Sequence, residues 1–187
     1  MKQKTDLRVV KTRQAIHQTF KTMICEMDSR EITVKELAER AQIHRKTFYL
    51  HYTSIESLYD DMLQEIANGY FLKVKELSDE LDIRELTRVF FEYFSNQELY
   101  VERLICHPSY RDFCSRLFVY LLHQNTKDRN LYTDFSEQKR NLIAVYLIST
   151  TLELYRQWVI DKKAVPLNEV INLSTSLICN GIASVSH

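Results

Sequence analysis

Glycine and proline are almost absent from this chain, and their scarcity constrains its fold more than any other feature. The 187 residues include only two of each. Hairpins and tight turns depend on these residues, so an all-β fold is disfavoured, and long helices joined by short polar links are favoured. Apolar residues make up 45% of the chain and charged residues 27%, which is enough for a sizeable core. We therefore expect an all-α fold.

Apolar residues at helical spacing predict where these helices lie. In the segment 6–27, Val9, Ile16, Phe20 and Ile24 recur at intervals of seven and four residues. The same kind of pattern predicts further helices at residues 33–41, 44–49, 55–77, 83–94, 97–106, 110–123, 136–160 and 167–185.

Two of the predicted helices begin with a capping signal. Thr33 and Glu36 match a capping box, in which the hydroxyl and the carboxylate each bond an unpaired backbone amide. Ser54 and Ser57 offer caps for the long helix that follows.

Charge is unevenly distributed along a chain that is neutral as a whole. Residues 1–53 contain eleven Lys and Arg against six Asp and Glu, a net charge of +5, so residues 54–187 carry −5. A basic module on an acidic remainder is typical of polyanion binding. We divide the chain accordingly into a polyanion-binding domain, residues 1–53 (the head), and a second domain that does not bind polyanions, residues 54–187 (the body).

The N-terminal segment, the apolar runs and the cysteines indicate the cellular compartment in which the protein is expected. The segment 1–12 is polar and basic, unlike a signal peptide, and no apolar run approaches the roughly 18 residues of a membrane helix. The four cysteines show no CxxC spacing, which favours reduced thiols. We expect a cytoplasmic protein that does not engage a membrane.

The segment 33–52 carries the functional signal. Two short helices joined by a turn at Gln42 and Ile43 form a helix-turn-helix, whose second helix enters the DNA major groove. Phe48 is expected to face the core and anchor that helix. Polar side chains that can reach base edges or phosphates then remain on the outside: Arg45, Lys46, Thr47, Tyr49 and His51, with His44 and Thr33 at the starts of the two helices.

This segment resembles the tetracycline-repressor (TetR) family of bacterial regulators. The resemblance covers about the first 60 residues and centres on Lys46-Thr47-Phe48-Tyr49-Leu50-His51-Tyr52, which matches the family string T-[FL]-Y-x-[HY]-[FY] after an A-x-[IV] turn. Two positions depart from the family: Gln42 stands where glycine is common, and His44 where a small polar cap is common. We expect Gln42 to adopt a left-handed backbone conformation at some cost, and His44 to cap weakly or to contact phosphate.

The resemblance also implies how the body works. Family members are all-α homodimers with a variable ligand-binding body, and most are repressors that a ligand releases from a palindromic operator. Their last two long helices form the dimer interface, and the corresponding apolar stripes here include Leu142, Val145, Tyr146, Ser149, Leu152, Leu173, Leu177 and Ile178.

An effector pocket is expected among the middle helices, for which the chain has eleven Tyr and nine Phe residues to draw on. The candidates for its wall are Tyr70, Phe90, Tyr93, Phe94, Phe113, Phe118, Tyr120 and Trp158.

Other functions have weaker support in the sequence. No GxSxG, P-loop or HExxH pattern is present, so we expect no enzyme and no cofactor. Cys106, His107, Cys114 and His123 leave a metal-responsive sensor open, although no tight ligand pair exists. A co-regulator that acts through a protein partner also stays open. The expected partners are double-stranded DNA, a second copy of the chain and an unknown small-molecule effector.

Overall fold

The computed structural model describes residues 7–77, 82–117 and 135–183, the side chains of 182 and 183 excepted. Within these ranges the regular structure is helical and there is no strand, which confirms the all-α fold. Residues 111–117 are also helical. The helices with their bounds are α1 (Leu7–Glu26), α2 (Val34–Arg40), α3 (Arg45–Tyr49), α4 (Ile55–Lys75), α5 (Ile83–Ser95), α6 (Leu99–Cys106), the 3₁₀ turn η1 (Pro108–Tyr110), α8 (Glu137–Ile160) and α9 (Leu167–Ala183).

The helices begin where side chains can satisfy unpaired amides. The Thr33 hydroxyl accepts from the Glu36 amide at 3.2 Å, while the Glu36 carboxylate pairs with Arg40 instead. Ser54 and Ser57 cap each other reciprocally at the start of α4. Of the two alternatives for His44, the weak cap is wrong, because its side chain makes no capping hydrogen bond to α3, and the phosphate contact stays a prediction.

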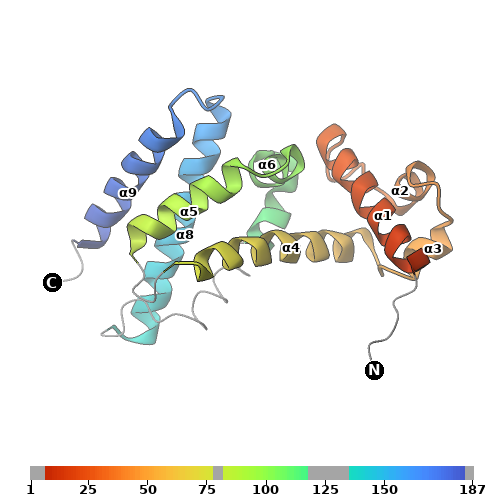
Figure 1. Ribbon diagram of the computed structural model, residues 1–187, viewed down its shortest axis with the longest axis horizontal. Helices are drawn as coiled ribbons and strands as arrows, with labels where there is room; N and C mark the ends of the chain where they lie inside the picture. The colour runs from red at the N-terminus through yellow and green to blue at the C-terminus, as the bar shows by residue number, and fades with distance from the viewer. Residues whose placement is uncertain (1–6, 78–81, 118–134, 184–187) are drawn as a thin grey trace.

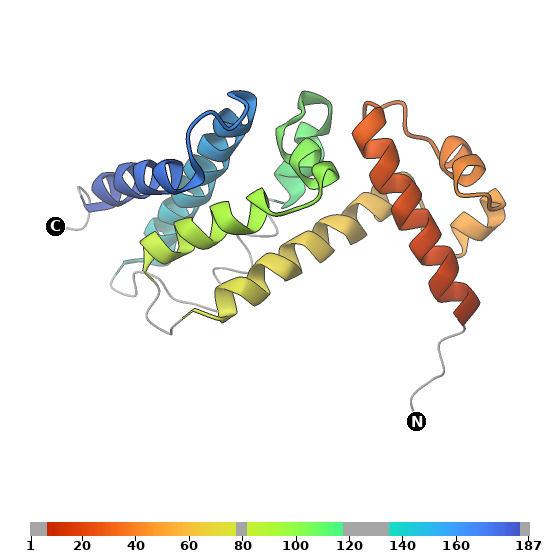
Figure 2. The same ribbon diagram turned by 45° about the horizontal axis from the view of Figure 1, so that its top comes forward.

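The molecule is elongated, with the DNA-binding candidate at one end. Helices α1, α2 and α3 lie together at that end, and α8 and α9 lie side by side at the other, next to α5 (Figure 1). Helix α4 runs from the head into the body, and α1 crosses its first turns (Figure 2). One hydrophobic core extends from Ile16 and Phe20 in α1, through α4, to Tyr155 and Trp158 in α8.

Most of the predicted dimer stripe is accessible in the single chain. Leu142 is 71% exposed and Leu173 57%, and Val145, Tyr146 and Leu177 are also exposed. Ser149 and Leu152 are partly buried. Ile178 is the exception: it is fully buried within its own chain, so the expectation that it faces a partner is corrected. None of the helices in the described ranges is long and apolar enough to cross a membrane.

Candidate nucleic-acid interface

The turn between α2 and α3 has the geometry of a helix-turn-helix. Gln42 adopts a positive φ of 55°, which confirms the left-handed conformation expected there. The amides of Ala41 and Ile43 donate to Leu37 O at 2.8 Å and to Ala38 O at 3.0 Å, which closes the end of α2. The chain therefore turns sharply enough to present α3 as a separate, exposed element.

Packing behind α3 fixes its orientation. Phe48 is fully buried, as predicted, and its ring lies 5.8 Å from the ring of Tyr52. Leu37 and Ala38 of α2 are also buried. Because the inward face of α3 is filled by Phe48, the polar residues on either side of it must face outward.

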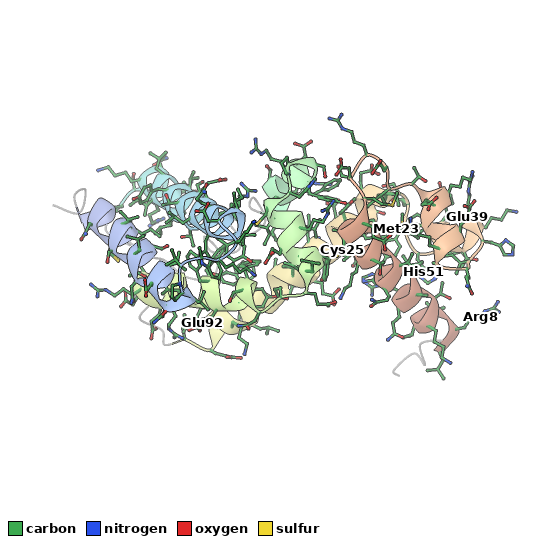
Figure 3. The ribbon with its side chains drawn as sticks, turned by 90° about the horizontal axis from the view of Figure 1, so that it is seen from above. Arg8, Met23, Cys25, Glu39, His51 and Glu92 are labelled. Carbon is green, nitrogen blue, oxygen red and sulfur yellow. The ribbon has the colours of Figure 1, made fainter. Side chains whose placement is uncertain are left out.

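The residues that the sequence predicts to contact DNA lie at the surface of the helix-turn-helix. Thr33, His44, Arg45, Lys46 and Tyr49 are exposed. Thr47 and His51 are partly buried, and His51 lies in the head, near the labelled Met23 and far from Glu92 in the body (Figure 3). Helix α3 has no acidic residue, and no salt bridge within the described ranges involves Arg45 or Lys46. Two cations are thus available to an anionic partner.

Leu50 belongs to the same surface, although the sequence did not single it out. Its side chain is 84% exposed at the C-terminal cap of α3, beside Tyr49. An exposed leucine among polar groups can contact a thymine methyl in the major groove. Hydrophobicity alone would assign leucine to the core; the signal is its position between Tyr49 and His51 in the motif.

A polar cluster ties the end of the recognition segment to two other helices. The Tyr52 hydroxyl donates to Asp61 Oδ2 at 2.7 Å, accepts from Arg13 Nε at 3.0 Å and lies 2.6 Å from His17 Nε2. Arg13 Nη2 also donates to both Asp61 oxygens, at 2.8 and 2.6 Å. Arg13 and His17 come from α1 and Asp61 from α4, so this cluster fixes α3 relative to both.

The cluster changes the ionisation of its members. Burial opposes the charge on Asp61, but hydrogen bonds from Arg13 and Tyr52 outweigh it and lower the carboxyl pKa. Burial lowers the pKa of His17, and the nearby Arg13 charge acts in the same direction. Burial raises the pKa of Tyr52 to about 12. The ionised forms of Arg13 and Asp61 and the neutral imidazole are therefore favoured.

The body contains a small apolar cavity between α5, α6, α8 and the helical residues 111–117. Its volume is about 10 Å³, at the limit of what one water molecule needs. Two of the predicted pocket residues, Phe90 and Phe94, line it. The complete lining is Phe90, Phe94, Ile105, Cys114, Leu117, Ile148 and Leu152.

The other predicted pocket residues do not line this cavity. Tyr70 packs behind it against Phe90 and Phe94. The Tyr93 hydroxyl donates to Ile66 O at 2.8 Å, and the Trp158 indole donates to Val165 O at 2.7 Å. Phe113 stacks on Tyr59 with ring centres 3.8 Å apart. Phe118 and Tyr120 lie outside the described residues.

The cysteine and histidine pairs considered for a metal are engaged in other contacts. Cys114 Sγ accepts from Arg156 Nη2 at 2.9 Å, and His107 Nδ1 lies 2.9 Å from the Ser109 hydroxyl. Burial raises the pKa of Cys106 to about 12, which disfavours the thiolate that binds metal. Within the described residues, no three His, Cys, Asp or Glu side chains gather as a metal site. His123 lies outside those residues.

The chain is similar in sequence to a known bacterial regulator of transcription. No family model matches the chain. A curated relative from Bacillus subtilis (strain 168), the uncharacterized HTH-type transcriptional regulator YxbF, is 28% identical over 147 residues, or 70% of this chain. The chain spans only 37% of that relative's length.

Solved structures match over almost the whole chain. A TetR transcriptional regulator from Streptococcus agalactiae 2603V superposes with a TM-score of 0.69 at 19% identity and covers 92% of this chain and 96% of its own. A putative TetR-family regulator from Shewanella sp. PV-4 gives 0.63 at 13% identity, with coverages of 91% and 97%. FadR from Bacillus subtilis in complex with stearoyl-CoA gives 0.58 at 12%, with coverages of 89% and 97%. The chain therefore has the all-α fold of the TetR-family transcriptional regulators.

Proposed function

We propose that this protein is a TetR-type DNA-binding regulator of transcription. The observation that carries the proposal is α3, a short exposed helix anchored by Phe48 that presents Arg45 and Lys46 with no acidic partner among the described residues. The helix-turn-helix geometry at Gln42 supports insertion of α3 into the major groove. The proposed contacts are Arg45, Lys46, Thr47, Tyr49 and His51, with His44, Thr33 and Leu50 at the edges.

We further propose that the protein acts as a homodimer on a palindromic operator. Exposed Leu142, Val145 and Tyr146 on α8 and Leu173 and Leu177 on α9 form an apolar face that a second copy can cover. Two copies related by a twofold axis place two recognition helices on successive major grooves. In this proposal residues 1–53 bind DNA and residues 54–187 provide dimerisation and regulation, in the cytoplasm.

The dimer proposal is tested by light scattering coupled to size exclusion. Leu142→Glu together with Leu173→Glu places like charges on the exposed face and is expected to give a monomer. The matched control is Leu72→Glu with Leu99→Glu, since both leucines are exposed elsewhere, on α4 and α6. A dimer that persists in the first variant contradicts the proposed face.

The proposed regulation is release of DNA by a small molecule that binds in the body. The side chains around Phe90 and Phe94 are apolar and suit an apolar ligand group, and the cavity of about 10 Å³ has to enlarge before such a group can enter. The neighbour FadR was solved with stearoyl-CoA, which supports ligand binding by this architecture in general. Because coupling between two sites is reciprocal, an effector that weakens DNA binding must itself bind less tightly to the DNA complex.

The DNA-binding proposal is tested by selecting bound duplexes from a random pool and measuring their affinity by fluorescence anisotropy. Arg45→Ala with Lys46→Ala is expected to weaken binding at least about thirtyfold for each head engaged, since each specific contact contributes about 1–3 kcal/mol. Lys73→Ala with Arg88→Ala changes net charge equally on the body and serves as control. Failure to recover any enriched sequence contradicts the proposal.

A further inference from the structure

A residue of the body caps the first helix of the head. Tyr110 lies in η1 and is fully buried. Its hydroxyl donates to Met27 O at 2.7 Å and lies 3.4 Å from Ile24 O. The last carbonyls of a helix have no partner within the helix, so these oxygens at the end of α1 depend on outside donors. Tyr110 supplies one from the body.

The loop after α1 is bonded to the same turn. The Ser29 hydroxyl donates to Ser109 O, and the Ser29 amide donates to Ser109 Oγ at 3.4 Å. His107 Nδ1 lies 2.9 Å from Ser109 Oγ. The end of α1 therefore meets η1 through several hydrogen bonds, and a shift of η1 must disturb them.

The chain that follows Tyr110 leads directly to the cavity of the body. Residues 111–117 are helical, and Cys114 and Leu117 lie four and seven residues after Tyr110, on the same side of the helix. Both line the apolar cavity opposite Phe90 and Phe94. One short helical segment thus has the α1 cap at its start and the cavity wall at its end.

A second contact connects this segment to the head through α4. Phe113 stacks on Tyr59 with ring centres 3.8 Å apart, and the Tyr59 ring meets Phe20 of α1 edge-on at 4.5 Å. The Tyr59 hydroxyl is buried close to the hydroxyl of Tyr110, and both burial and that neighbour raise the pKa of Tyr59. A shift of the segment 108–117 therefore also changes the contact between Tyr110 and α4.

We propose that Tyr110 is a positioning residue that transmits occupancy of the cavity to the orientation of the DNA-binding head. A ligand group that enters the cavity displaces Cys114 and Leu117, moves the segment 108–117 and breaks the Tyr110 bond to α1. The inference rests on the proposed function, because it assumes that the head binds DNA and that the cavity is the effector site.

Cavity-filling substitution tests the link without an identified effector. Cys114→Leu adds bulk to the cavity wall in place of a ligand and also removes the sulfur that accepts from Arg156, whereas Tyr110→Phe removes only the hydroxyl. Cys114→Ala loses the same bond without added bulk and is expected to leave DNA affinity unchanged. We expect Cys114→Leu to weaken binding to the selected DNA duplex about tenfold in the native background. In the Tyr110→Phe background it is expected to change affinity less than twofold. Cys114→Val provides a smaller addition in case the leucine variant does not fold.

A matched control separates coupling from general overpacking. Val89→Leu adds one methylene to a buried α5 residue that is not part of the cavity lining, and it is expected to leave DNA affinity unchanged. Equal effects of Cys114→Leu in both backgrounds overturn the role of Tyr110. So does an effect of Val89→Leu as large as that of Cys114→Leu.

Hydrogen exchange gives a readout that does not depend on DNA. Amides in residues 24–31 are expected to exchange faster in Cys114→Leu and in Tyr110→Phe than in the native protein, because both changes release the end of α1. Unchanged exchange in Cys114→Leu overturns the coupling. If the native protein selects no DNA but this exchange response is present, the proposed function fails while the structural link stands.

Discussion

The hydroxyl of Tyr52 is expected to stabilise the protein more than an ordinary single hydrogen bond does. It contacts three polar groups, Arg13 Nε at 3.0 Å, Asp61 Oδ2 at 2.7 Å and His17 Nε2 at 2.6 Å, and the tyrosine is buried. Tyr52→Phe removes the hydroxyl without changing the ring that packs on Phe48. The substitution therefore isolates the polar cluster from the hydrophobic core.

The magnitude follows from the partners. A hydrogen bond to a charged group contributes about 1.5–3 kcal/mol net, and Tyr52 makes two of them. The Arg13 side chain is 54% exposed and keeps its own bonds to Asp61, so water and those bonds replace part of the loss. We expect Tyr52→Phe to lower the free energy of unfolding by about 2 kcal/mol.

Tyr93→Phe is the matched control, because it removes the same atom from a site with one neutral partner. The Tyr93 hydroxyl donates only to Ile66 O, and its loss is expected to cost about 1 kcal/mol or less. Urea unfolding followed by circular dichroism measures both losses. The midpoint is expected to fall while the dependence of the free energy of unfolding on urea concentration stays the same. A loss in Tyr52→Phe no greater than in Tyr93→Phe would refute the cooperative role of the cluster.

Three further predictions concern single positions. A Cβ at Gly69 would clash with the Tyr93 hydroxyl, so Gly69→Ala is expected to destabilise the native protein by about 1–2 kcal/mol but to add little further loss in the Tyr93→Phe background. Thermal unfolding of the native protein, the two single variants and the double variant tests this, and an equal effect of Gly69→Ala in both backgrounds contradicts it. Gln42→Gly is expected to raise stability by up to about 1 kcal/mol and Gln42→Val to lower it, because φ is positive there, and urea midpoints in the opposite order would refute this. Burial lowers the pKa of His17, so the folded state favours neutral imidazole, and its contribution to stability is complete above the ordinary pKa of about 6.5 and is lost as pH falls toward the lower folded value. In His17→Gln the free energy of unfolding is expected to change less between pH 7 and pH 5 than in the native protein. The same pH dependence in both proteins would exclude His17 as the titrating group.

Features set by neighbouring residues could be predicted from the sequence. Helix bounds agreed within a few residues, as for α4, because apolar spacing and the caps at Thr33 and Ser54 act locally. The left-handed turn at Gln42 and the burial of Phe48 followed from the motif for the same reason.

Features that depend on distant segments could not be predicted. Arg13, His17 and Asp61 lie on two helices, and only the fold brings them to Tyr52. Ile178 directly follows exposed Leu177 and lies on another face of α9, the buried face that also carries Val170 and Ser174. The sequence does not show which of the two faces meets the chain's own core. Arg156 lies four residues after Leu152 and so continues the spacing of the predicted stripe, yet its guanidinium bonds Ile105 O and Cys114 within the same chain. Periodicity identifies an apolar face but not what covers it.

The central claim, that α3 binds DNA through its exposed cations, is tested most directly by the salt dependence of binding. Each cation that contacts a phosphate contributes about 0.9 to the slope of log K against log salt concentration. Arg45→Ala with Lys46→Ala is expected to reduce that slope by about 1.8 for each head engaged, while Lys73→Ala with Arg88→Ala leaves it unchanged. A slope that is the same in both variants and in the native protein would contradict the account.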